Sequence, residues 1–266
     1  KDAYYQLINN NVLDMEAFSA PEASQVEKSI YAKYSQAREQ ITEAIHSELL
    51  NEDAAPLGAL PEDMFAYMQY IYSFLVSEGI IMTGQISQDA DYYQAWRDDT
   101  ISLRDYLYAG IADSWIDTTK LSIESRYSGA DDVYSRIVEY VMADLETDQS
   151  FAKRIYRYLI NDGIITGREL CLALYSQNIL AYDEGEVRML EQNGEEYAFQ
   201  FIRQKISDIE ITPAQLALEP CSGGVIIVDI NTGDTLACVT YPSYDNNRLT
   251  NVMDSEYYNS LRRDLS

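Results

Sequence analysis

The sequence predicts a mainly α-helical protein with a short C-terminal β-hairpin, and therefore an α+β fold overall. In roughly the first 220 residues, apolar side chains recur every three to four positions, as they do on one face of a helix. These runs are separated by helix stop and start signals, such as Gly79 and Asn161-Asp162-Gly163. At residues 222–247 the pattern changes to SGGVIIVDINTGDTLACVTYPSYDNN, where two apolar runs flank a turn sequence.

Two helices are marked clearly in the N-terminal half. Ser19-Ala20-Pro21-Glu22 fits a capping box, in which a serine and a glutamate satisfy free backbone N–H groups at a helix start. It predicts a helix whose apolar stripe runs from Val26 to Leu49. Pro61-Glu62-Asp63 predicts a second start, with acids at the positive end of the helix dipole, and Gly79 is placed to end that helix.

Further start signals divide the C-terminal half. Ser128 is predicted to cap one helix, and Thr147 to begin another that closes at Gly163. Thr166-Gly167-Arg168-Glu169 is a second capping box, the acidic stretch from Asp183 to Glu186 repeats this pattern, and Asn193-Gly194 separates the last two helices.

One short pattern occurs twice. SEGIIMTG at residues 77–84 resembles NDGIITG at residues 161–167, and each follows an aromatic-rich helix and precedes a new start. Two explanations are open: duplication of a helical unit, or reuse of the same turn chemistry at two helix ends.

Composition restricts the classes of function. The chain has 266 residues and a formal net charge of −25, so it repels nucleic-acid phosphates and anionic lipid, and nucleic acid is not expected as a partner. Cys171, Cys221 and Cys238 lack metal or redox spacing and are interpreted as reduced thiols. The single histidine, His46, lies on a helical pattern and cannot build a multi-histidine site. We therefore expect no metal and no cofactor.

The hairpin is predicted from two apolar runs and the turn Asn231-Thr232-Gly233-Asp234. Pairing Ile230 with Thr235 places Cys238 opposite Ile227, so a disulfide between Cys238 and Cys221 is not expected. The continuous apolar run from Val225 is typical of a strand covered on both faces. A two-stranded sheet is marginal in water, so these faces are expected to need partners.

The hairpin region resembles the segment that opens the transpeptidase domain of class B penicillin-binding proteins. The resemblance rests on Gly223-Gly224, the strand to Asp229, Thr232-Gly233, Leu236-Ala237 and the run Pro242-Ser243-Tyr244-Asp245 with Asn247. The tail at residues 257–266 is similar to the next segment of that family. The resemblance covers about 45 residues and implies a D,D-transpeptidase that cross-links peptidoglycan through a serine ester and binds penicillin.

No catalytic, cofactor-binding or metal residue is assigned in this chain. The family's chemistry requires Ser-x-x-Lys, Ser-x-Asn and Lys-Thr-Gly elements after the hairpin. Ser150-Phe151-Ala152-Lys153 and Ser176-Gln177-Asn178 match two of them formally, but both precede the hairpin, and no Lys-Thr-Gly occurs. Ser150 is interpreted as a residue of a helix's first turn, and this chain alone is expected to be catalytically inactive.

The resemblance implies two parts: residues 1–217 as a helical, non-catalytic pedestal or insert, and residues 218–266 as the start of a transpeptidase domain. It also implies a location on the extracytoplasmic face of a bacterial membrane, with an anchor upstream. The implied partners are peptidoglycan stem peptides and β-lactams for the whole protein, and cell-wall synthesis proteins for the helical part. The alternative is a helical protein-interaction or scaffold module with no enzymatic activity.

Overall fold

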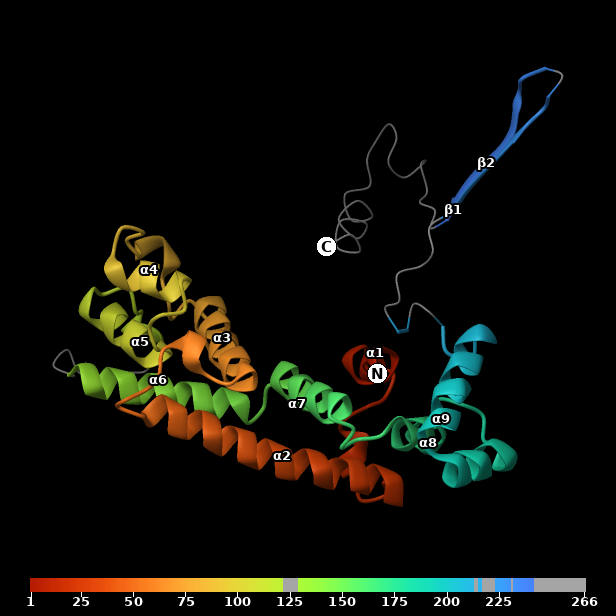
Figure 1. The fold of residues 1–266 in the computed structure, drawn as a ribbon, viewed down its shortest axis with the longest axis horizontal. Helices are drawn as coiled ribbons and strands as arrows, with labels where there is room; N and C mark the ends of the chain where they lie inside the picture. The colour runs from red at the N-terminus through yellow and green to blue at the C-terminus, as the bar shows by residue number, and fades with distance from the viewer. Residues whose placement is uncertain (122–128, 213–214, 217–222, 231, 242–266) are drawn as a thin grey trace. The chain divides into compact units, whose positions relative to one another are not determined.

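The computed structural model describes residues 1–121, 129–212, 215–216, 223–230 and 232–241 (Figure 1). It confirms the predicted fold class, because the described chain is a series of helices followed by one antiparallel hairpin. The α-helices are α1 (Asp2–Asn9), α2 (Gln25–Leu50), α3 (Glu62–Ser77), α4 (Asp91–Arg97), α5 (Leu103–Ala112), α6 (Ala130–Leu145), α7 (Gln149–Asn161), α8 (Gly167–Ser176) and α9 (Glu184–Ser207). Short 3-10 helices lie at Ala17–Ser19, Leu57–Ala59, Thr83–Gln85 and Thr118–Leu121.

The start of α2 differs from the prediction. The capping box that forms is that of Ser24 and Glu27, while Ser19 ends a 3-10 helix, so the predicted box at Ser19 is wrong. Ser24 Oγ accepts from the N–H of Glu27 at 3.2 Å, and the Glu27 carboxylate accepts from the N–H of Ser24 at 2.8 Å. Glu27 also accepts a hydrogen bond from the Gln177 amide at 3.2 Å. The contact between Glu27 and Gln177, which is distant in the chain, therefore favours the capping box at Ser24 over the similar sequence at Ser19.

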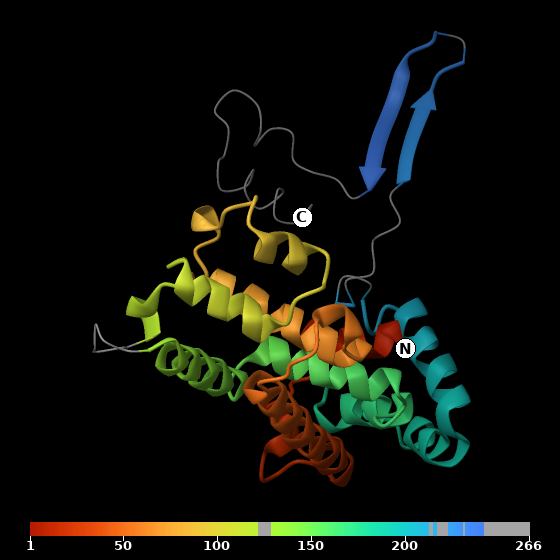
Figure 2. The same cartoon turned by 60° about the vertical axis from the view of Figure 1, so that its left-hand side comes forward.

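The long helix α2 is the common packing partner of the helical region. It contacts α3, α6, α7 and α8 as well as the 3-10 helix that precedes it (Figures 1 and 2). The Tyr134 hydroxyl of α6 donates to the Leu49 carbonyl at the end of α2, at 2.6 Å. Arg38 of α2 donates to the Leu145 and Glu146 carbonyls, so a cation lies at the negative end of α6. The apolar stripe predicted from Val26 to Leu49 has its buried residues at Ile30, Ile45 and Leu49.

The same turn ends several helices. Gly79 and Gly163, which belong to the repeated pattern, have φ of +68° and +73°. In each case the glycine N–H donates to the carbonyl three residues before it, and the next N–H donates to the carbonyl five residues before its own position, as in a Schellman motif. Left-handed residues with the same two bonds are Asp99, Ser114, Asn178 and Ile209. The same turn therefore also ends helices whose sequences do not match the repeated pattern.

Most helices in the C-terminal half begin where the sequence predicts. Thr166 and Glu169 form the expected capping box, and the Asp183 carboxylate accepts from the N–H of Glu186 at 2.9 Å. Asp148, one residue after the predicted Thr147, caps α7. Ser128 lies outside the described residues, and α6 begins at Ala130 after Gly129. The two helices expected around Asn193-Gly194 are confirmed, because α9 consists of two helices that meet at a kink where Gly194 has non-helical φ and ψ.

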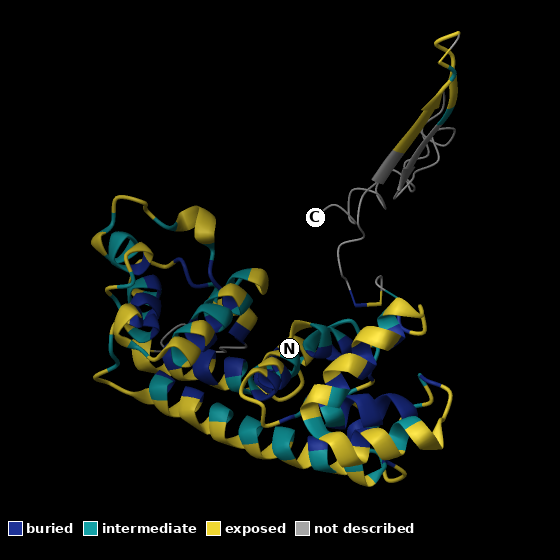
Figure 3. Ribbon diagram, turned by 45° about the vertical axis from the view of Figure 1, so that its right-hand side comes forward, coloured by how far each residue is buried: buried dark blue, intermediate teal, exposed yellow. Residues whose placement is uncertain are grey.

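Contacts divide the chain into two compact units, Lys1–Phe201 and Ile202–Ser266. The first unit contains most of the buried side chains, as Figure 3 shows. The second contains the end of α9 and the hairpin of β1 (Gly223–Val228) and β2 (Thr235–Tyr241).

The hairpin forms, but its register differs from the prediction by two residues at Thr235 and by one residue at Cys238. Val228, not Ile230, pairs with Thr235, and Cys238 lies opposite Ile226. The connection is wider than expected, because Asp229 N–H donates to the Asp234 carbonyl and Gly233 N–H donates back to the Asp229 carbonyl, each at 2.8 Å. A bulge between Ile227 and Val228 accommodates the extra residue. Cys221 lies outside the described residues.

Candidate functional site

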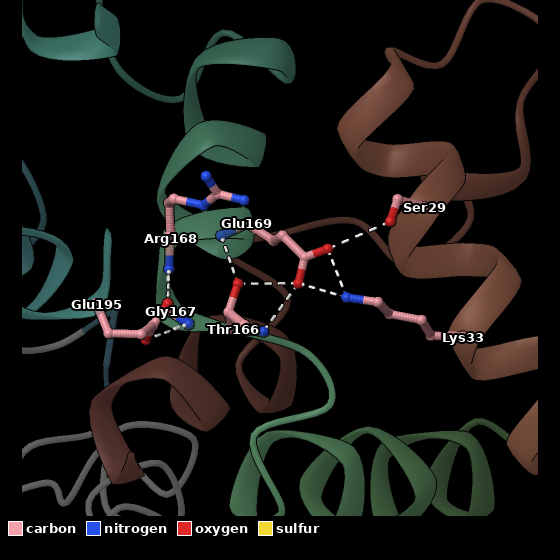
Figure 4. A network of polar contacts seen from close by, with 7 residues as sticks. All are labelled: Ser29, Lys33, Thr166, Gly167, Arg168, Glu169 and Glu195. Carbon is pink, nitrogen blue, oxygen red and sulfur yellow. Dashed lines mark hydrogen bonds and ion pairs between the residues drawn. The ribbon is translucent and has the colours of Figure 1, made fainter. Parts of the chain in front are cut away.

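A polar network joins α2, α8 and α9 in the helical unit (Figure 4). Glu169, only 8% exposed, is its centre. The Lys33 ammonium donates to both carboxylate oxygens of Glu169, at 2.6 and 2.8 Å, and Ser29 Oγ donates at 3.2 Å. The N–H and hydroxyl of Thr166 each donate to the same carboxylate at 2.9 Å. Glu195 accepts from the first N–H groups of α8, those of Gly167 and Arg168, at 2.9 and 3.0 Å.

This network has a structural role, because it holds the start of α8 against α2 and α9. Burial would raise the pKa of Glu169, but the hydrogen bonds from Lys33 and Thr166 hold that pKa below its usual value. Each Glu169 oxygen already accepts hydrogen bonds from protein donors. The N–H groups at the start of α8, which have no partner within the helix, donate to the Thr166 hydroxyl and to the Glu195 carboxylate. The donors and acceptors of this network thus satisfy one another, and we do not assign a binding site to it.

A groove of about 820 Å³ lies between α1, α3 and α7 in the helical unit. Its basic side chains are Lys153, Arg154 and Arg157, all on α7, and they are called the cationic trio below. Their spacing of three and four residues brings them toward one side of the helix. The groove thus brings three cations together in a very acidic chain.

Each member of the cationic trio is held by a neutral group. The Lys153 ammonium donates to the Asn9 carbonyl at 2.8 Å. Arg154 lies over the ring of Tyr70, with its guanidinium carbon 4.6 Å from the ring centre, and Arg157 lies 5.2 Å from the centre of the Tyr5 ring. These cation–π contacts orient the guanidinium groups without neutralising their charge.

Acidic groups face the same groove. Glu62 and Asp63 lie in the first turn of α3, and Asp162 follows the end of α7. Burial raises the pKa of Tyr67 to about 12; Asp63 acts in the same direction and Arg154 opposes it. A hydrogen bond with Asp162 raises the pKa of the Tyr158 hydroxyl. The groove thus presents carboxylates and cations around two tyrosine hydroxyls.

A smaller, mostly apolar hollow of about 270 Å³ adjoins the groove. It shares Asp63, Tyr67 and Tyr158 with the groove. The rest of its lining comes from α2 and from the start of α3: Ala37, Gln40, Ile41, Ala44, Pro61 and Met64. The two spaces together offer an apolar pocket beside a charged one, which suits a ligand with both kinds of group.

The serine motifs that match the transpeptidase pattern do not form one site. Ser150 and Lys153 line the groove, whereas Ser176 lines a different hollow with Asp14 and Glu27. Ser150 lies in the first turn of α7, as expected, with its N–H donating to Asp148 at 2.8 Å. Lys153 donates to Asn9, which is not the arrangement of a lysine that takes a proton from serine. That neither motif is catalytic stays a prediction.

The other candidate residues lie apart from the groove. Cys171 is buried, and burial raises the pKa of its thiol. His46 is exposed on α2. Within the described ranges, no group of three or more histidine, cysteine, aspartate or glutamate side chains is placed to hold a metal ion. In that same part of the chain, no helix is both long and apolar enough to cross a membrane.

Sequence reasoning did not identify the groove. The spacing of Lys153, Arg154 and Arg157 on a predicted helix was a visible signal, but nothing local indicated that α1 and α3 would face it. Comparisons of this chain with protein-family models, with curated proteins and with solved structures find no match.

Proposed function

We propose that this chain is part of a class B penicillin-binding protein, in which residues 1–217 form a non-catalytic helical region and residues 218–266 open the transpeptidase domain. The observation that carries the proposal is the hairpin. Val225, Ile226 and Ile227 are 60%, 66% and 51% exposed, although each is an apolar strand residue. Because successive side chains of a strand point to opposite faces, both faces of the hairpin are apolar and uncovered within the described residues.

Such a hairpin is expected to belong to a larger sheet that covers it. The ordered series of residues from Gly223 to Asn247 resembles the sequence that opens a transpeptidase domain, and such a domain would supply the cover. In that setting the whole protein attacks the carbonyl of a stem peptide with a serine hydroxyl. The peptide bond breaks, the terminal D-alanine leaves as a free amine, and an acyl-enzyme remains. The amine of a second stem peptide then attacks the ester, takes the acyl group and releases the serine hydroxyl. β-Lactams would acylate the same serine. We place the protein on the extracytoplasmic face of the membrane on the same basis.

The test is to determine the coding sequence that follows the codon for Ser266. The proposal expects Ser-x-x-Lys, then Ser-x-Asn, then Lys-Thr-Gly, in that order. A polypeptide that includes them should gain one penicilloyl adduct in its intact mass, while residues 1–266 alone should gain none. A stop codon, or continuation without these elements, would contradict the proposal.

The second candidate is a helical protein-interaction module without enzymatic activity. The groove between α1, α3 and α7 favours it, since a charged groove beside an apolar hollow is a binding feature that needs no catalysis. An adduct on residues 1–266 would contradict both candidates and would indicate that Ser150 is a nucleophile.

A further inference from the structure

The groove between α1, α3 and α7 carries three cations in a chain with a large excess of acids. The sequence has 44 acidic residues and 19 lysines and arginines, so a cation in this protein has many acids to pair with. Lys33, Arg136 and Arg188, for example, form ion pairs of 2.6 to 2.7 Å. Among the described residues, Lys153, Arg154 and Arg157 form no ion pair within 4.0 Å. The cationic trio is therefore three charges on one helix without a carboxylate partner in the described chain.

The contacts of the trio leave its donors accessible. Arg154 and Arg157 are exposed, and the guanidinium carbon of each lies over a tyrosine ring. A cation–π contact leaves guanidinium N–H groups available for a planar, bidentate acceptor. A carboxylate is such an acceptor, and its hydrogen bonds with arginine are stronger than those between neutral groups.

The acids that line the groove have local structural roles of their own, at the start of α3 and directly after the end of α7. Glu62 and Asp63 favour the dipole at the start of α3, and Asp162 is hydrogen-bonded with Tyr158. They nevertheless give the groove a negative side. Asp63, Tyr67 and Arg154 all line the groove, so its acids and its cations face the same space.

We propose that this groove binds a short zwitterionic peptide, one that carries both a free carboxylate and a free ammonium. Its carboxylate lies against Arg154 and Arg157, its ammonium lies toward Asp63 and Glu62, and an apolar side chain enters the adjoining hollow lined by Ile41 and Met64. A polyanion is disfavoured by the overall charge of −25, and an apolar ligand would leave the trio unpaired. The proposal is independent of the transpeptidase proposal, because every residue it uses lies in Lys1–Phe201.

Isothermal titration calorimetry on the full 266-residue chain tests this proposal. One probe is the wall stem pentapeptide L-Ala-γ-D-Glu-L-Lys-D-Ala-D-Ala with free amines and carboxylates. The other is the linear all-L peptide Ala-Glu-Lys-Ala-Ala. We expect at least one to bind with a Kd of about 1 mM or below. Amidation of its carboxylates, or acetylation of its amines, should weaken binding by about tenfold.

The variants separate the groove from non-specific attraction. Arg154→Gln combined with Arg157→Gln should weaken binding by about tenfold or more, because two carboxylate contacts are removed. Arg136→Gln combined with Arg188→Gln is the matched control: it removes the same two charges from exposed positions outside the groove and should leave the affinity unchanged. Helical circular dichroism confirms that each variant is folded.

Three outcomes would overturn the proposal: neither peptide binds at about 10 mM, amidation has no effect, or the double variant at Arg154 and Arg157 binds as the unaltered protein does. The amidated peptide needs no variant, so the proposal stays testable if the double variant fails to fold. Preference for the wall peptide over the all-L peptide assigns the ligand to peptidoglycan. Equal binding, or a preference for the all-L peptide, assigns it to an ordinary protein segment with the same charges.

Discussion

At the scale of single residues, Glu169 shows how a buried charge is made stable in this chain. Its carboxylate is almost fully enclosed, yet it accepts hydrogen bonds from α2 and from the start of its own helix. Because the ionised form has these donors, the pKa of Glu169 is lowered despite burial. The pair with Lys33 therefore links the pH of the solution to the packing of α8 on α2.

We expect Lys33→Met to lower the free energy of unfolding by about 1–2 kcal/mol at neutral pH. The figure is below that for breaking a fully buried ion pair, because the Lys33 side chain is 31% exposed. Urea unfolding followed by circular dichroism measures it. Lys28→Met, at an exposed position on the same helix, is the control and should change stability by less than about 0.5 kcal/mol.

The same variant tests the pH dependence. A folded-state pKa below the ordinary value of 4.5 gives stability that is present above that pH and is lost as the pH falls through the folded pKa. Lys33→Met removes a cause of that lowering, so its stability should fall less steeply with acid than that of the unaltered chain. Parallel curves for the two proteins would show that Glu169 does not interact with Lys33 in solution.

At the scale of elements, the recurring helix-ending turn requires one residue with positive φ. Glycine adopts that conformation without strain, whereas a side chain at the same position costs energy. At Gly163, no heavy atom lies within 4 Å of the place where a Cβ would be added, so the backbone conformation is the sole source of strain from a methyl group there.

Gly163→Ala should therefore lower the free energy of unfolding by about 1 kcal/mol. Gly84→Ala is the matched control, since a Cβ there also meets no atom within 4 Å and Gly84 has no positive φ. That control should be neutral or slightly stabilising. Equal destabilisation by both changes would contradict the left-handed conformation of Gly163.

The elements were largely predictable because their signals are local. Capping boxes, apolar periodicity and helix-stopping glycines each act within a few residues, and they identified α3 and α8 correctly. The failures have tertiary causes. Ser24 was favoured over Ser19 where Gln177 reaches Glu27, and a bulge shifted the hairpin register. The groove depends on α1 meeting α7, a pairing that no local pattern encodes.

At the scale of the whole molecule, the helical unit buries many tyrosines. Burial is the first cause of the raised pKa of Tyr4, Tyr67, Tyr106, Tyr134 and Tyr156. A tyrosine whose folded pKa is raised gives stability that is complete below its ordinary value of 10.0 and is lost as the pH rises through the folded pKa. The unfolded chain releases these protons first, so alkali favours unfolding.

We expect cooperative alkaline unfolding above about pH 10, with tyrosinate absorbance rising as helical circular dichroism falls. Tyr156→Phe should move the midpoint to higher pH, because it removes one buried ionisable group. Tyr182→Phe, at a side chain that is 71% exposed, should leave the midpoint unchanged. Full tyrosine ionisation with the helices intact would contradict the burial described here.

The contact between Lys153 and the Asn9 carbonyl joins positions 144 residues apart in the chain, and this separation has a consequence for the order of folding. Helix-ending turns close within six residues and can form early, whereas bringing α1 to α7 requires closing a very long loop. We therefore expect the groove to be among the last features to assemble. Any ligand that binds it would recognise only chains whose folding is complete.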